Sequence, residues 1–136
     1  MSTRPSDSDY RRMLAFREGL RRFLHWSEQQ ALALGVTPAH HQLLLAIRGH
    51  GDGEPTIGDV AGHLLLRHHS VVGLVDRAER AGLVQRRVDG HDHRVVRLRL
   101  TEKGSRRLAK LVASHLEELE RLGPPYSRVG TPRVSK

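Results

Sequence analysis

Two strand-like segments, residues 83–88 and 95–100, flank the turn-rich segment 89–94, and this pattern constrains the fold more than any other. Valine and leucine alternate there with arginine, which is typical of a two-stranded ribbon with a turn at its tip. The apolar side chains are expected on one face of the ribbon and the arginines on the other. The arginines concerned are Arg86, Arg87, Arg97 and Arg99. Such a positive face is expected where a hairpin lies along phosphate groups.

The residues before the ribbon carry two short helical patterns separated by a turn near 65–67. Thr56 is a favourable N-cap for the first helix, and Gly82 ends the second in the left-handed conformation that glycine tolerates. The second helix is predicted to bury the stripe Val71, Leu74, Val75 and Ala78 and to turn His69, Gly73, Asp76 and Arg80 outward. This order of elements predicts a winged helix-turn-helix, a mainly α fold with a small β-wing. DNA binding is the leading hypothesis, because the N-terminal half of the second helix would enter a major groove.

Two longer amphipathic helices are predicted on either side of this module. In a single subunit they are expected to expose Met13, Phe16, Leu20, Phe23 and Leu24 in the first helix, and Leu108, Leu111, Leu116 and Leu119 in the last. A second subunit would cover these side chains. The predicted organisation is an N-terminal tail (1–8), a helical dimerisation region (9–34 and 103–122), a winged helix-turn-helix DNA-binding domain (37–101) and a C-terminal tail (123–136) that is expected to be disordered or draped on the surface.

The charge balance favours a polyanionic partner. The 23 Lys plus Arg residues outnumber the 15 Asp plus Glu residues and give a formal net charge of +8, so nucleic acid is the economical choice. The length of 136 residues predicts one domain, and the lack of Cys excludes disulfides and Cys-type zinc sites. The chain has no apolar run of membrane-spanning length and no signal-peptide pattern, so a cytoplasmic protein without membrane contact is expected.

Metal binding and catalysis are not expected. Imidazole ligates several transition metals, and the chain has 10 histidines. The adjacent pairs His40-His41 and His68-His69 nevertheless lack the i, i+4 spacing that places two ligands on one helix face, so no metal and no cofactor are predicted. No G-x-S-x-G turn, no Cys and no recognisable Ser–His pairing is present, so the chain is predicted not to be an enzyme.

Five motifs follow one another between about residues 10 and 120. They are Thr37-Pro38-Ala39, Ser70-Val71-Val72-Gly73-Leu74-Val75-Asp76-Arg77, Ala81-Gly82-Leu83-Val84, Asp89-x-x-Asp92-x-Arg94 and Leu98-x-Leu100-Thr101-x-x-Gly104. Their ordered combination resembles the MarR family of bacterial transcriptional regulators. The resemblance implies a homodimer in which the first and last long helices of both subunits entwine, while each winged helix reads half of a pseudo-palindrome. It also implies that a small ligand, often an aromatic acid or other phenolic compound, binds between the two lobes and relieves repression.

Two features depart from the family's pattern. Family members commonly have a further C-terminal helix, and here Pro124, Pro125 and Gly130 interrupt the place where it would lie. Dimerisation would then depend on the two long helices alone. Positions of the recognition helix and wing that are often Ser, Thr or Arg in the family carry His68, His69, Gly73 and His91. The operator sequence therefore cannot be carried over from relatives.

The predicted DNA-binding residues lie on the outward face of the second helix and on the wing. They are Arg67, His68, His69, Ser70, Val72, Gly73, Arg77, Arg80, Arg86, Arg87, His91, His93 and Arg94. Asp76 and Asp92 are expected to pair with neighbouring arginines, because a carboxylate that faces phosphate is repelled. Ser70 has two open interpretations, a helix cap or a phosphate contact.

The predicted ligand-binding residues are Trp26, His41 and His115, in the pocket where the long helices meet the DNA-binding lobe. His115 interrupts the apolar stripe of the last helix, so a hydrogen-bonded interface histidine is the first interpretation and a ligand contact or pH sensor the second. The function predicted first is a ligand-responsive repressor that binds a pseudo-palindromic operator as a homodimer. The alternative is a winged-helix adaptor that binds RNA or protein in a larger assembly.

Overall fold

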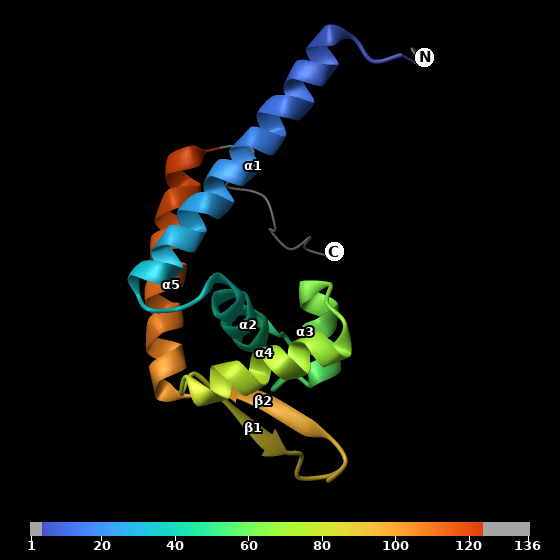
Figure 1. Ribbon diagram of the computed structural model, residues 1–136, viewed down its shortest axis with the longest axis vertical. Coiled ribbons are helices and arrows are strands. Elements are labelled where there is room, and N and C mark those ends of the chain that lie inside the picture. The colour runs from blue at the N-terminus through green and yellow to red at the C-terminus, as the bar shows by residue number, and fades with distance from the viewer. Residues whose placement is uncertain (1–3, 124–136) are drawn as a thin grey trace, which may run out of the picture. The chain divides into compact units, whose positions relative to one another are not determined.

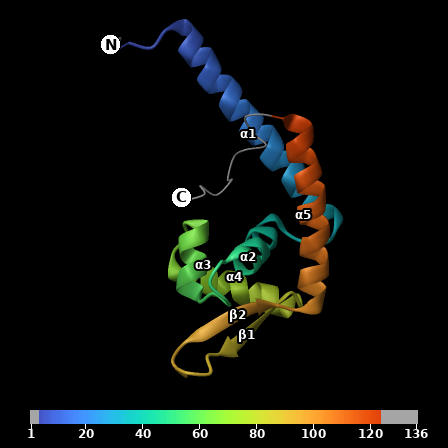
Figure 2. The ribbon, with the colours of Figure 1, turned by 180° about the vertical axis from the view of Figure 1, so that it is seen from behind.

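The computed structural model describes residues 4–123, which divide at residue 38 into two compact units. The first unit holds α1 (Asp7–Ala33). The second holds α2 (Pro38–Gly49), α3 (Ile57–Leu64), α4 (His68–Arg80), β1 (Val84–Val88), β2 (Val96–Leu100) and α5 (Glu102–Leu122) (Figure 1, and Figure 2 from behind). The predicted fold class, mainly α with a two-stranded wing, is confirmed. None of the described helices combines the length and apolar character needed to cross a membrane.

Helix α1 begins two residues earlier than predicted. Ser6 and Asp9 form a capping box, in which the Asp9 N–H donates to Ser6 Oγ (3.2 Å) and the Ser6 N–H donates to Asp9 Oδ2 (2.9 Å). The last two residues of the predicted N-terminal tail therefore belong to the helix. Along α1 the large apolar side chains Tyr10, Met13, Leu14, Phe16, Leu24 and Leu32 are exposed.

The helix-turn-helix is built as the sequence predicts. Thr56 caps α3 through its own capping box with Asp59. Leu65 ends α3 with φ 55° and ψ 42°, in the left-handed region. The predicted stripe of α4, consisting of Val71, Leu74, Val75 and Ala78, is buried throughout, and Gly82 follows that helix with φ 75°. Burial of this stripe fixes which face of α4 points to solvent.

The wing is an antiparallel ribbon whose register corrects one prediction. Arg86 pairs with Leu98, while Arg87 pairs with Arg97. Side chains on paired residues share a face, so Arg86 lies on the apolar face with Leu98 and not with the other arginines. The prediction that all four ribbon arginines share one face was wrong for Arg86, because two arginines in succession must point to opposite faces of a strand.

Helix α5 starts in tight contact with the junction between α4 and β1. The Thr101 Oγ1–H donates to the Gly82 carbonyl (2.6 Å) and the Thr101 N–H to the Leu83 carbonyl (3.0 Å), while Lys103 Nζ donates to the Ala81 carbonyl (2.9 Å). A methyl group at Gly104 would overlap the Leu83 carbonyl oxygen, so only glycine fits there. The base of α5 is thus hydrogen-bonded to the segment that directly follows α4.

The first half of α5 differs from prediction in its exposure. Leu108 and Leu111 were expected to be exposed, but both are buried within the single chain, while Leu116 is 59% exposed. The apolar stripe of α5 therefore serves the core of the subunit near its start and faces solvent near its end. Gly123 closes the helix with φ 67°, and the predicted C-terminal tail from residue 124 onward lies outside the described residues.

Candidate nucleic-acid interface

The N-terminal end of α4 is open to solvent. Arg67 is the N-cap, with extended backbone and no side-chain hydrogen bond to the helix. Arg67, His68, His69 and Ser70 are all exposed. The first N–H groups of a helix lack partners within the helix and carry the positive end of its dipole, so this end attracts an anion. Two of the four exposed side chains are histidines and one is an arginine, which adds to that attraction.

Ser70 lies inside the first turn of α4 and not at its cap. Its backbone N–H donates to the Arg67 carbonyl (3.0 Å), as in a helix that has already begun. The interpretation of Ser70 as the helix cap was therefore wrong. A phosphate contact stays a prediction for this residue.

The middle of α4 carries the remaining predicted residues of the recognition helix. Val72 and Gly73 are half-buried, while Arg77 and Arg80 are exposed. The guanidinium of Arg77 lies beside Gly73, at 3.4 Å from where a Cβ would stand. Burial lowers the pKa of His40 from its usual value, and the nearby charge of Arg77 lowers it further. The outward face of α4 thus presents the cations Arg77 and Arg80 beside the exposed carboxylate of Asp76.

Arg86 bonds the wing to α4. Its Nη2 donates to Asp76 Oδ1 (2.7 Å), and its Nη1 donates to Glu79 Oε1. The predicted pairing of Asp76 with an arginine is confirmed. With two carboxylates as partners, the charge of Arg86 is locally balanced, and its guanidinium is directed at the helix. The structure thus gives Arg86 a role within the fold, separate from the DNA contact that the sequence predicts.

Glu54, which lies 33 residues from Arg87 in the sequence, partly neutralises the positive face of the ribbon. Arg87 Nε donates to both carboxylate oxygens of Glu54 (3.1 and 3.2 Å), which raises the pKa of Arg87. Arg97 Nη1 donates to the Glu54 carbonyl (3.2 Å), and the Leu98 N–H donates to the Pro55 carbonyl (2.8 Å). The loop between α2 and α3 is therefore attached to β2.

The tip of the wing is an ordered turn built around Asp89. Its Oδ2 accepts from the N–H groups of Asp92 (2.9 Å) and His91 (3.0 Å), and its Oδ1 accepts from Arg97 Nε (3.2 Å). These bonds, the two backbone ones first, lower the pKa of Asp89 from 3.8 to about 2. The turn fixes the direction in which the neighbouring wing-tip side chains leave the ribbon.

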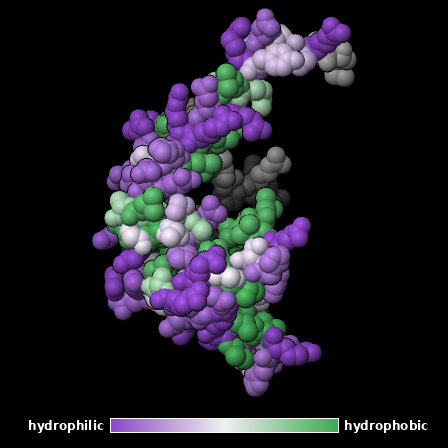
Figure 3. Space-filling model, viewed as in Figure 1, coloured by the Kyte–Doolittle hydropathy of each residue, from purple (hydrophilic) through white to green (hydrophobic). Residues whose placement is uncertain are grey.

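Asp92 orients Arg94 at this tip, as predicted. Arg94 Nε and Nη2 donate to the two oxygens of Asp92, with both donor–acceptor distances at 3.1 Å. The Arg94 side chain is 91% exposed. His91 and His93 are exposed beside it. Figure 3 shows hydrophilic surface at the end of the wing. An arginine that is exposed and also held in place is suited to contact a phosphate or a groove edge.

The structure thus gathers the predicted DNA-binding residues into two patches, the outward face of α4 and the wing tip, while Arg86 and Arg87 are engaged in ion pairs within the fold. No sequence pattern indicated Glu54, which lies 33 residues from Arg87. Asp89 had a visible signal, since an aspartate before glycine is typical of a turn.

His41 and His115 lie against each other, with ring centroids 5.0 Å apart in an edge-to-face arrangement. His115 Nδ1 lies 2.6 Å from the Leu111 carbonyl oxygen, so it donates to that carbonyl. The hydrogen bond of the first interpretation is present, and the position of His115 at an interface stays a prediction. Burial lowers the pKa of His41, and the charge of His115 lowers it further. Trp26 belongs to the first unit, where its ring lies 6.0 Å from that of Phe23.

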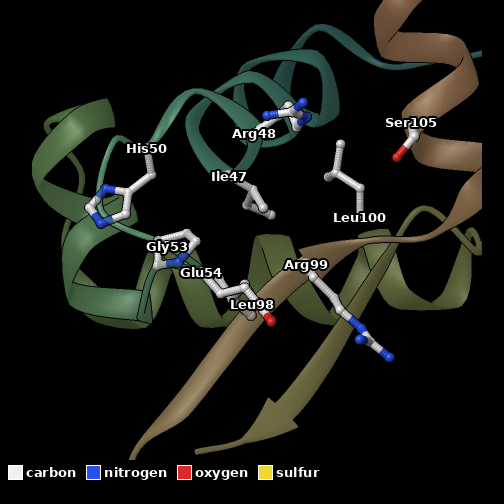
Figure 4. A pocket seen from close by; sticks show the side chains of 10 residues that line it. Ile47, Arg48, His50, Gly53, Glu54, Leu98, Arg99, Leu100 and Ser105 are labelled. Carbon is white, nitrogen blue, oxygen red and sulfur yellow. The ribbon is translucent and has the colours of Figure 1, made fainter.

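A pocket of about 470 Å³ lies within the second unit, among α2, the following loop, β2 and the start of α5. Ile47, Leu98 and Leu100 give it apolar walls (Figure 4). Arg48 also lines it, whereas the side chain of Arg99 points away from these apolar residues and its Nε donates to Gln85 Oε1 (3.2 Å). The three predicted ligand-binding residues do not line this pocket.

A histidine pair that the sequence did not reveal joins α3 to the loop before it. His50 Nδ1 lies 2.9 Å from His63 Nε2, and His50 Nε2 lies 3.7 Å from Asp59 Oδ2. Among residues 4–123, no group of three or more His, Asp or Glu side chains is arranged to hold a metal ion. The pair is thus a hydrogen-bonded contact between imidazoles.

Residues 34–95 match the model of the MarR family. A curated relative, the uncharacterised HTH-type transcriptional regulator YsmB of Bacillus subtilis, is 34% identical over 67 residues. That alignment covers 49% of this chain and 46% of the relative, so the chain spans about half the length of the curated relative it matches.

Solved structures of similar fold include AbsC, a MarR family transcriptional regulator from Streptomyces coelicolor (TM-score 0.77, 20% identity, 94% of this chain and 89% of that one). The MarR family transcription regulator SP03579 has a TM-score of 0.76 at 24% identity, over 90% of this chain and 80% of that one. A point mutant of S. aureus MepR, bound to an oligodeoxyribonucleotide, has a TM-score of 0.68 at 24% identity, over 81% of this chain and 80% of that one. At these identities the likenesses concern the fold.

Proposed function

We propose that the chain is a transcriptional regulator of the MarR family that binds DNA in a sequence-specific manner, because residues 34–95 match the model of that family. The observation that carries the proposal is the open N-terminal end of α4, which presents the exposed side chains of Arg67, His68 and His69. Because the buried stripe fixes the rotation of α4, these side chains would meet the base edges of a major groove.

The wing supplies the second contact in this proposal. Arg94 is exposed and held by Asp92, so its guanidinium can reach a minor groove or a phosphate without first being ordered. The net charge of +8 favours the same polyanionic partner. The solved complex of MepR with an oligodeoxyribonucleotide supports a protein of this fold on DNA.

We further propose that the protein acts as a homodimer on a pseudo-palindromic operator. The exposed apolar side chains of α1 and the exposed end of α5 at Leu116 support a second subunit as cover. Two recognition helices related by a two-fold axis would lie about 34 Å apart, one helical turn of DNA. In this proposal the dimerisation region, 9–34 and 103–122, joins the DNA-binding domain, 37–101, through the base of α5, which lies in the same unit as α2 to β2.

Repression relieved by a small aromatic or phenolic ligand completes the proposal. His41 and His115, half-buried and in ring contact, are the candidate ligand-binding residues of the second unit, and Trp26 is the candidate of the first. A ligand that separates the two imidazole rings would change the position of α5 against α2. A repressor of this kind would act in the cytoplasm, where bacterial DNA is found.

The test is binding of the full chain to the DNA upstream of its own gene, measured by fluorescence anisotropy and footprinting at two salt concentrations. We expect a protected palindrome and an affinity that falls steeply with salt, because Lys and Arg displace counterions from phosphates. Equal and weak binding to every duplex, together with binding to structured RNA or to a protein partner, would contradict the proposal and favour an adaptor.

A further inference from the structure

The turn between α3 and α4 contains an unusual residue. Among residues 4–123, Leu65 is the one non-glycine residue with positive φ (φ 55°, ψ 42°). In this left-handed conformation the Cβ of an L-residue crowds the following carbonyl, so glycine is the favoured residue there. The turn itself imposes the conformation, because the N–H groups of Leu65 and Leu66 both donate to the Ala61 carbonyl.

The side chain of Leu65 is not needed inside the subunit. It is 91% exposed, so packing does not compensate for the strain of its backbone. Glycine would satisfy the turn at lower cost, and a polar residue would suit the solvent better. A strained backbone together with an exposed leucine indicates that the side chain has a partner outside the subunit.

The surroundings of Leu65 indicate what that partner is. Leu65 stands two residues before the N-cap Arg67, and Leu66 beside it is 43% exposed. Figure 3 shows hydrophobic surface over the end of α3. Between Gly62 and Val75 the chain has no carboxylate, while Arg67 is an exposed cation and His68 and His69 are exposed imidazoles beside it. An apolar side chain on a positive surface fits a polyanion that also has apolar groups, and DNA has these in its deoxyribose carbons and thymine methyl groups.

We propose that Leu65 contacts DNA through its apolar side chain, at the edge of the groove that α4 enters, and that this contact retains a leucine in a glycine-type turn. The inference rests on the proposed DNA-binding function and adds a determinant on the turn that precedes the recognition helix. A leucine that reads sugar carbons or thymine methyls adds affinity and shape selection without a phosphate contact.

Two substitutions separate the side chain from the strain. Leu65→Ala removes the apolar contact and keeps a Cβ in the left-handed conformation, so the backbone strain remains. Leu65→Gly removes the apolar contact and the strain together. We expect both variants to bind the operator about fivefold or more weakly, with an unchanged slope of log affinity against log salt, because no phosphate contact is lost. Leu65→Gly alone should raise the melting temperature by a few degrees, because glycine relieves the strained turn.

Leu45→Ala is the matched control, since Leu45 is a 49% exposed leucine of the same unit that belongs to α2 and not to the turn before α4. It should bind DNA like the wild type. Wild-type affinity of both Leu65 variants would overturn the proposal and point to a protein partner for this leucine. Wild-type binding by only one of the two variants would also overturn it, because both variants lack the apolar side chain. A wild-type chain that binds no DNA would instead refute the proposed function, which keeps the two failures distinct.

Discussion

Arg86 of β1 and Asp76 of α4 form an ion pair with an N–O distance of 2.7 Å, which connects the wing to α4. Glu79, one helical turn further along α4, accepts from the same guanidinium. The pair lies on the face of the ribbon that packs against α4, where the Arg86 side chain is 29% exposed. The position of the wing beside the recognition helix thus depends on an arginine that the sequence pattern placed on the opposite face.

The first prediction is that Arg86→Ala destabilises the fold. It leaves Asp76 and Glu79 close together without their shared cation, so the free energy of unfolding should fall by about 1 to 3 kcal/mol. Urea denaturation followed by circular dichroism measures this. Arg80→Ala, on the exposed face of α4, is the control and should stay within about 0.5 kcal/mol of the wild type. Equal stability of the two variants would show that the Arg86 pair is dispensable.

Arg94→Ala should weaken DNA binding without changing the stability of the fold. The Arg94 side chain is exposed and bonded only locally to Asp92, so the melting temperature should not change. Affinity for specific and nonspecific duplexes should fall alike, by about tenfold, because a wing contact to the minor groove or phosphate carries little sequence information. Anisotropy titrations with both duplexes test this. Unchanged affinity at two salt concentrations would remove the wing from the DNA interface.

Specificity is expected to depend on His69. It is exposed within the first turn of α4, where side chains reach base edges. His69→Ala should therefore change the preferred half-site more than it changes nonspecific affinity. Selection from a random duplex library with wild type and variant compares the two preferences. The same preferred site from both proteins would exclude a base-reading role for His69.

The acid response of the wing tip follows from the pKa of Asp89. Its folded value of about 2 lies below the 3.8 of an unperturbed carboxyl, so its bonds stabilise the fold fully above about pH 3.8 and are lost as the pH falls through about 2. Carboxyl ¹³C shifts recorded against pH should show that midpoint. Arg97→Gln should raise it only in part, because the N–H groups of Asp92 and His91 are the larger causes. A wild-type midpoint near 3.8 would mean that the turn is not formed in solution.

Assembly is tested at Leu116. A charge at this exposed position should not unfold the subunit, but it should oppose burial in a dimer interface. We expect Leu116→Glu to sediment as a 15.3 kDa monomer at concentrations where the wild type is twice that mass. Glu117→Gln on the neighbouring exposed position is the control. A wild type that is already monomeric and binds its operator fully would contradict the proposed homodimer.

The sequence predicted most of the fold because local signals agreed with one another. Thr56 and Gly82 mark helix ends, and each occurs at the expected end in the structure. The buried stripe of α4 was predicted residue by residue, since the helical period fixes it. Asp92 was correctly assigned to Arg94 because the two are near neighbours along the chain.

Contacts between distant segments could not be predicted in this way. Nothing in the local pattern connects Glu54 with Arg87 or His50 with His63, because their contacts depend on how α2, α3 and the wing pack. Arg86 was misplaced for a related reason, since an arginine on an apolar strand face is explained only by carboxylates from another element. Leu65 shows the same limit, because its left-handed backbone is a property of the turn geometry and not of leucine.

The close approach of Gly104 to the Leu83 carbonyl holds the base of α5 against the segment that follows α4. Helix α5 has 21 residues and α4 has 13, so they extend about 30 Å and about 20 Å from this contact. If both helices turn as one body, a rotation of about 10° moves the far end of α5 by about 5 Å and the N-terminal end of α4 by about 3 Å. In that case a displacement of α5 near Leu116 is accompanied by a displacement of Arg67 at the N-terminal end of α4.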